Sequence, residues 1–215
     1  MSFRKMAGWA GVLFVVFNMV AFFIWGTPPS ADAPASEVAK YLADGGNTYK
    51  FGVALTGIAT IFMVVFIAGF LVPFFRSDRE HGEGYGTLVL GGILVSGAMY
   101  VVAIAANAAL VLRGGFELDA ATTRALWDFQ YVAYALAILA VPIFAGGAAM
   151  AIGKRSVMPA WFGYFSWVVA LLGFTGVAGT VSGSNIGMLT LAGYLGLLLW
   201  TLAGGIVLLR DRTAA

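Results

Sequence analysis

The chain has 215 residues, of which 61% are hydrophobic and only 10% are charged, and its formal net charge is +2. Soluble domains carry about 25% charged residues, so this composition excludes a soluble globular domain, a disordered chain and a nucleic-acid-binding protein. The mean hydropathy of +0.93 is typical of a membrane protein with several spanning segments. The length suits one helical bundle without a second domain.

Six long apolar segments follow one another, and each approaches the about 20 residues that a membrane-spanning helix requires. Because lipid cannot satisfy open backbone groups, the expected fold is all-α, and no segment shows the alternating polarity of a transmembrane β-strand. The predicted helices are 8–25, 51–75, 87–112, 125–152, 161–181 and 186–209.

The first apolar segment raises the question of a cleaved signal peptide. Arg4 and Lys5 precede it, and Ala31-Asp32-Ala33 has the small residues of a cleavage site. The apolar run is longer than the core of a signal peptide. We therefore expect a retained first helix.

The longest polar connection is predicted at 26–50, and it contains a short amphipathic helix at 36–43. Ser36 can cap this helix, and Gly45-Gly46 is expected to end it. The helix is either a connector that packs its apolar face on the bundle or a lid over a pocket.

The basic residues predict the orientation. With a cytoplasmic N-terminus, the inner loops carry twice as many basic residues as the outer loops, as the positive-inside rule requires. Both termini are therefore expected in the cytoplasm. The inner residues are Arg4, Lys5, Arg76, Arg79, Lys154, Arg155, Arg210 and Arg212, and the outer ones are Lys40, Lys50, Arg113 and Arg124.

Three local signals concern helix ends and breaks. Pro73 and Pro142 are expected to kink their helices, and Asp119 is placed to cap the fourth helix. The similar triplets 72–74 and 141–143 hint at duplicated hairpins, which would suit a transporter with a site between repeats.

Polar side chains gather in the outer halves of the helices. Such groups turn away from lipid, so their stripes predict a cup that opens outward and takes a partly apolar ligand. The alternative is that they only join helices, at about 0.6 kcal/mol per hydrogen bond. The candidate ligand-binding residues are Asn18, Ser96, Tyr100, Asn107, Asp128, Gln130, Tyr131, Tyr134, Thr175 and Tyr194, and Ser182 lies at the end of the same stripes.

Asp128 is the one acidic residue expected at membrane depth. Arg124 lies four residues before it on the same helical face, so a local ion pair is one interpretation. A carboxylate that binds ligand or couples to protons is the other. Lys50 and Arg113 are expected near the same mouth.

Catalytic and cofactor signals are absent from the sequence. It has no cysteine and one histidine, His81, which excludes thiolate chemistry and a bis-histidine haem. No zinc-protease, serine-hydrolase or P-loop motif occurs. We therefore expect a non-enzymatic protein without a cofactor or a bound metal.

Four elements carry a resemblance that spans nearly the whole chain. They are Ser36–Leu42, Arg113–Trp127, Met158–Tyr164 and Leu199-Trp200. Together they resemble a family of small six-helix integral membrane proteins of unknown function that is common in high-GC bacteria of the actinobacterial type. The resemblance implies a protein of the bacterial plasma membrane and implies no activity.

Three functions compete at this point. The first is binding of a lipid or a small amphipathic molecule in the outward-facing cup. The second is a small transporter, or the substrate-binding subunit of one. The third is an accessory subunit that packs in a homo-oligomer or a larger membrane complex. Membrane lipids are the expected partners in every case.

Overall fold

The computed structural model describes residues 1–113, 118–181 and 186–210, and this part of the chain is helical without a strand. Six helical spans are long and apolar enough to cross a membrane, which confirms the predicted all-α membrane fold. Ser182 and Arg212 lie outside the described residues. The spans are Phe3–Trp25, Ala35–His81, Tyr85–Leu112, Ala120–Arg155, Ala160–Gly179 and Ile186–Arg210.

In three of the six spans one turn residue divides the helix, at Leu71, Ala140 and Phe174, although the backbone angles there remain near those of a right-handed helix. The chain therefore divides into more helices than the sequence analysis expected. They are α1 (Phe3–Trp25), α2 (Ala35–Phe70), α3 (Val72–His81), α4 (Tyr85–Leu112), α5 (Ala120–Leu139), α6 (Val141–Arg155), α7 (Ala160–Gly173), α8 (Thr175–Val181) and α9 (Ile186–Arg210).

Two of these breaks fall next to the prolines at which the sequence predicts a kink. Pro73 and Pro142 stand at the second positions of α3 and α6, where the missing N–H group removes a helical hydrogen bond. At the second break, the Ile143 amide donates to the Ala140 carbonyl over 3.1 Å, a tighter turn than an α-helix makes. The break at Phe174 has no proline and was not predicted.

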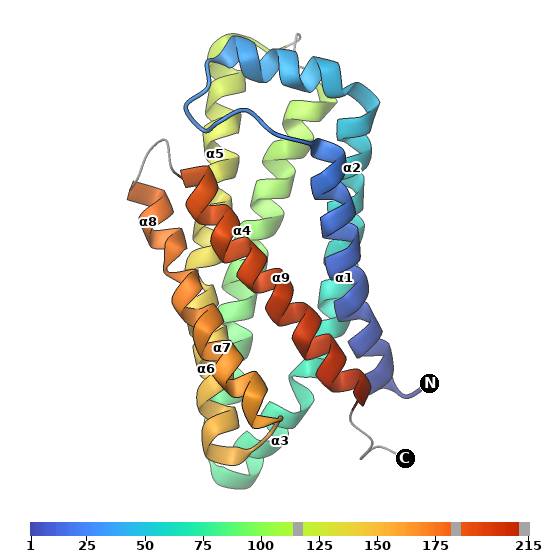
Figure 1. Ribbon diagram of the computed structural model, residues 1–215, viewed down its shortest axis with the longest axis vertical. Helices are drawn as coiled ribbons and strands as arrows, with labels where there is room; N and C mark the ends of the chain where they lie inside the picture. The colour runs from blue at the N-terminus through green and yellow to red at the C-terminus, as the bar shows by residue number, and fades with distance from the viewer. Residues whose placement is uncertain (114–117, 182–185, 211–215) are drawn as a thin grey trace.

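The short helix expected at 36–43 is the first part of α2. It begins at Ala35 behind Pro34, so the expected Ser36 cap is wrong. Gly46 adopts φ 43° and ψ −122°, a conformation open to glycine, and the helix resumes directly after this bend. The predicted connection 26–50 therefore contains the expected short helix, and the spanning part of α2 begins directly after Gly46 instead of at residue 51. In Figure 1 the first part of α2 crosses one end of the bundle.

The first turns of α1 and the last turns of α9 lie at the opposite end of the bundle (Figure 1). A Cβ added to Gly8 would lie 2.8 Å from Leu209 Cγ, so the start of α1 and the end of α9 are in contact. We call this the terminal end, and we call the end with 26–34 and the bend of α2 the far end. The half of the bundle toward the terminal end holds a packed aromatic core of Phe66, Phe70, Phe74, Phe144, Phe162 and Trp200.

Two carboxylates, those of Asp119 and Glu83, stabilise connections between helices. Asp119 accepts hydrogen bonds from the amides of Ala121 and Thr122 at 2.9 Å each, so its predicted role as a helix cap is confirmed. The hydrogen bond from the Thr122 hydroxyl is the main cause that lowers the pKa of Asp119. At the terminal end, Arg155 binds Glu83 with N–O distances of 2.8 and 3.0 Å. This closes the connection between α3 and α4 onto α6.

We expect Gly92→Ala to destabilise the bundle by about 1–3 kcal/mol, because overpacking strains a close contact. A Cβ at Gly92 would lie 2.7 Å from the backbone nitrogen of Phe144, and a backbone atom of α6 cannot move aside cheaply. Gly91→Ala is the matched control, because no atom lies within 4 Å of a Cβ there. Unfolding by SDS in mixed micelles measures both, and equal stabilities would contradict the contact.

Candidate functional site

Asn18 is the centre of a polar network that joins three helices. Its Oδ1 atom accepts hydrogen bonds from the Tyr100 hydroxyl at 2.5 Å and the Tyr194 hydroxyl at 2.7 Å. Its Nδ2 atom donates to the Phe14 carbonyl over 2.8 Å. Asn18 is 2% exposed, so every polar atom of its side chain is satisfied inside the protein.

Asn107 on α4 forms the second half of this network. Its Oδ1 atom accepts from the Tyr49 hydroxyl at 2.7 Å, and its Nδ2 atom donates to the Tyr134 hydroxyl over 3.3 Å. The ring centroids of Tyr100 and Tyr134 lie 5.9 Å apart and connect the two halves. We call the six residues Asn18, Tyr49, Tyr100, Asn107, Tyr134 and Tyr194 the tyrosine–asparagine network.

Five of these six residues were sequence candidates, and Tyr49 was missed. The Gly45-Gly46 pair indicated a helix end, which placed Tyr49 in the loop. The spacing of Tyr49, Gly52 and Thr56 could have found it, because residues three and seven apart share a helical face. All three are buried in α2.

Other candidates lie apart from the network. The Ser96 hydroxyl donates to the Ala137 carbonyl over 2.8 Å and ties α4 to α5. Gln130 is 4% exposed and lies on the core side of α5. The Thr175 hydroxyl donates to the Leu172 carbonyl over 2.7 Å, across the break between α7 and α8.

Arg124 fastens the segment 26–34 to α5. Its guanidinium donates to the Ala31 carbonyl over 2.5 Å and also to the Ala33 carbonyl. The same group binds Asp128 with an N–O distance of 2.9 Å, so the local ion pair expected from the spacing is present. The Asp128 side chain is 48% exposed. Its observed partner is therefore Arg124, at the rim of the bundle.

Two further side chains of α5 hold the same segment. The Tyr131 hydroxyl donates to the Pro29 carbonyl over 3.1 Å, and the Trp127 indole donates to the Ser30 carbonyl over 3.4 Å. Four backbone carbonyls of the segment, those of Pro29, Ser30, Ala31 and Ala33, therefore accept hydrogen bonds from side chains of α5. The segment 26–34 and the first part of α2 together cover the far end of the bundle (Figure 1).

A pocket of about 180 Å³ remains under the bend of α2, and we call it the far-end pocket. Lys50 is the one charged side chain in its lining, and it forms no ion pair with another described residue. Tyr49 stacks on Trp25 at a centroid distance of 5.8 Å behind the pocket wall. The lining consists of Leu42, Ala43, Gly46, Tyr49, Lys50, Leu110 and Val111.

A second, smaller cavity of about 50 Å³ lies between α2 and α4 near the middle of the spans, and we call it the α2–α4 cavity. Tyr100 lines this cavity and Tyr49 lines the far-end pocket, so the tyrosine–asparagine network contributes a wall to each. The lining consists of Phe14, Thr60, Met63, Ile67, Ile93, Ser96, Gly97, Tyr100, Phe144 and Leu197.

Both cavities are smaller than the roughly 300–1,000 Å³ of a site that encloses a drug-sized ligand. Each has room for one part of a larger molecule. Within the described part of the chain, no three His, Cys, Asp or Glu side chains gather as a metal site would require. Comparison of the sequence with family models and with curated proteins, and of the fold with solved structures, finds no match.

Proposed function

We propose that this protein binds an anionic amphiphile, such as a membrane lipid, with the polar end of the ligand in the far-end pocket. The observation that carries the proposal is the combination in that pocket of an apolar wall and one lysine. Lys50 forms no ion pair within the described chain, so an anionic group can bind there without displacing a protein carboxylate. Leu42, Leu110 and Val111 offer an apolar surface to the adjoining chain.

The proposal is for binding without catalysis. The polar atoms nearest the pocket are engaged with each other, because the Tyr49 hydroxyl donates to Asn107. A catalytic pair needs a base within hydrogen-bond reach of the group that it activates. The arrangement of Tyr49 and Asn107 supports a structural role for these side chains and leaves Lys50 to contact the ligand.

We place the protein in the bacterial plasma membrane with both termini in the cytoplasm. The support is the charge distribution, because seven described basic residues belong to the terminal end and four to the far end. The far-end pocket then faces outward and meets lipids of the outer leaflet. The basic residues of the terminal end are Arg4, Lys5, Arg76, Arg79, Lys154, Arg155 and Arg210.

Transport of the same amphiphile is the second candidate function. The similar starts of α3 and α6, Val72-Pro73 and Val141-Pro142, favour it, because many transporters are built from internal repeats. Stimulation of a partner ATPase by the bound amphiphile would support this role.

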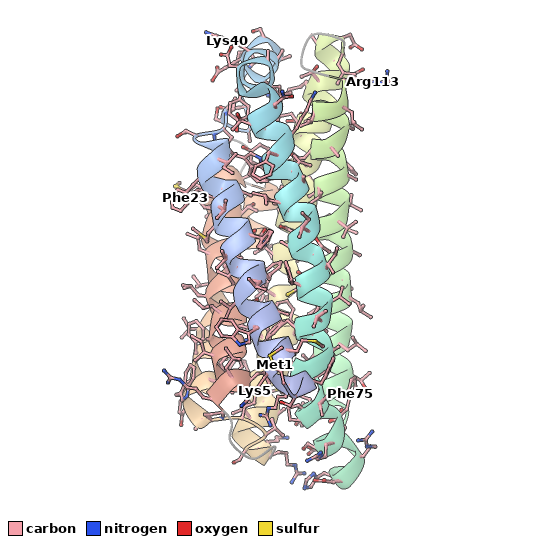
Figure 2. All side chains as sticks on the ribbon, turned by 90° about the vertical axis from the view of Figure 1, so that its right-hand side faces the viewer. Met1, Lys5, Phe23, Lys40, Phe75 and Arg113 are labelled. Atoms are coloured by element: carbon pink, nitrogen blue, oxygen red, sulfur yellow. The ribbon has the colours of Figure 1, made fainter. Side chains whose placement is uncertain are left out.

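The test is native mass spectrometry of the protein purified in detergent, with extraction and identification of retained lipid. Lys50→Gln should lower the retention of phosphatidylglycerol about fivefold, since one lysine near a membrane surface contributes about 1 kcal/mol. Lys40→Gln is the matched control, because Lys40 lies at the same end and does not line the pocket (Figure 2).

The apolar wall is tested in the same way. Ala43→Leu reduces the space in the pocket and should lower retention, whereas Ala39→Leu lies one helical turn earlier, outside the lining, and should leave it unchanged. Wild-type protein without any bound lipid would contradict the proposal. Stable extra subunits in that empty protein would instead support the role of an accessory subunit.

A further inference from the structure

The α2–α4 cavity has two walls and a floor that come from five helices. Thr60, Met63 and Ile67 form a stripe on α2, and Ile93, Ser96, Gly97 and Tyr100 form the facing stripe on α4. Phe14, Phe144 and Leu197 close the inner side from α1, α6 and α9. The cavity is therefore built into the packing of the bundle.

The cavity lies near the middle of the membrane. Lys50 and Arg76 are the basic residues nearest the two ends of the apolar stretch of α2 and α3, and Met63 in the cavity wall stands midway between them in sequence. The distance from either basic residue to Met63 is about 20 Å along a helix, and half of the hydrocarbon core is about 15 Å thick. The ends of lipid chains from both leaflets meet at this depth.

The cavity wall opens toward lipid at Gly97. This residue is exposed, and a Cβ added there would meet no atom within 4 Å. Ile61 and Val64 on α2 and Leu94 on α4 flank the opening and are 65%, 63% and 61% exposed. Figure 2 faces the side of the bundle on which α2 and α4 run next to each other. At this depth the surrounding medium is hydrocarbon.

The polar atoms in the wall are already satisfied. The Ser96 hydroxyl donates to Ala137, the Thr60 hydroxyl donates to the Thr56 carbonyl over 3.1 Å, and the Tyr100 hydroxyl donates to Asn18. A polar ligand would find no free partner here and would lose its own hydration. The chemistry of the cavity therefore favours a hydrocarbon occupant.

We propose that the α2–α4 cavity binds the methyl end of a lipid acyl chain, which enters sideways between the two helices at Gly97. The site is separate from the far-end pocket and takes a different part of a lipid. It does not rest on the proposed function, because a chain end from either leaflet reaches it.

The test uses two photoreactive phosphatidylcholines in nanodiscs, one with a diazirine near the methyl end of a chain and one with it near the carboxyl end. After irradiation, mass spectrometry locates the labelled residues. The methyl-end probe should label 60–67 and 93–100 more strongly than Leu171, which is 69% exposed near the middle of another span. The carboxyl-end probe should not prefer these residues.

Two variants test the proposal further, because each places a larger side chain in the cavity, one from α4 and one from α2. Gly97→Leu and Thr60→Phe should each lower this labelling about tenfold, which corresponds to about 1.4 kcal/mol. Gly91→Leu is the matched control, because Gly91 is an exposed glycine of the same helix with equally open space and lies outside the lining. Thermal unfolding of each variant shows that it remains folded.

Equal labelling of the cavity and of Leu171 in wild type would overturn the proposal, and so would an unchanged pattern in both cavity variants. Lys50→Gln should leave the methyl-end labelling unchanged. Its effect on retained lipid therefore reports on the far-end pocket alone, and failure of one proposal can be told from failure of the other.

Discussion

Asn18→Leu is expected to lower the free energy of unfolding by about 3 kcal/mol, because two tyrosine hydroxyls lose their shared acceptor at membrane depth. Asn18 accepts from Tyr100 and Tyr194 and is 2% exposed, so neither hydroxyl finds water when the amide is removed. Unfolding by SDS in mixed micelles measures the loss. A cost below about 0.6 kcal/mol, the average for one hydrogen bond in a membrane, would contradict this role.

A double-mutant cycle separates the hydrogen bond from the packing. Tyr100→Phe and Tyr194→Phe should each cost about 0.6 kcal/mol in wild type. In the Asn18→Leu background, Tyr100→Phe should be neutral or stabilising, because it removes a hydroxyl that has lost its partner. The same cost in both backgrounds would show that the 2.5 Å contact contributes nothing to stability.

The tyrosine–asparagine network stands between the far-end pocket and the α2–α4 cavity. Tyr49 stands in the wall of the far-end pocket, and Tyr100 stands in the wall of the α2–α4 cavity. Between them, Asn107 and Tyr134 connect the helices by hydrogen bonds and ring contact. The polar stripes were predicted either to surround a ligand or to join helices, and five of the ten candidate residues form hydrogen bonds with one another: Asn18, Tyr100, Asn107, Tyr134 and Tyr194.

Composition and local rules predicted much of the fold. The apolar segments predicted six spans, two prolines predicted two of the three breaks, and Asp119 predicted a helix start. These signals are local, since each depends on a few neighbouring residues and on the surrounding lipid. The Arg124–Asp128 ion pair was predictable for the same reason.

The remaining features depend on how distant segments meet. The short helix ends at Gly46 as expected, since this residue has a non-helical conformation with φ 43°, but a second helix follows directly and carries Tyr49 into the core. The break at Phe174 has no proline, and Gly176 of α8 packs closely on the backbone of α5 there. Both cavities are lined by α2 and α4, and their lining residues on the two helices lie about 30 to 70 positions apart in sequence. Periodicity within a short window of sequence cannot predict a contact between residues so far apart.

Arg124→Met is expected to release the segment 26–34 from α5 while the spans stay folded. The change removes the donors to the Ala31 and Ala33 carbonyls, and both alanines are buried, at 8% and 4% exposure. Hydrogen bonds from a charged donor contribute about 2 kcal/mol. The first part of α2 directly follows the released segment, so amide hydrogen exchange in residues 35–44 should become about thirtyfold faster. Exchange in α6 and α7 should not change.

Asp128→Asn removes the ion pair but keeps the hydrogen bonds by which Arg124 holds the segment 26–34. Arg124 keeps both carbonyl acceptors in this variant, and an exposed ion pair contributes at most about 1 kcal/mol. Exchange in residues 35–44 should therefore rise less than about fivefold. If Asp128→Asn accelerates exchange as much as Arg124→Met, the carboxylate positions the guanidinium and the two carbonyl contacts depend on it. If only Arg124→Met does so, the far end of the bundle is closed by the arginine itself, and access to the far-end pocket should increase in the same variant.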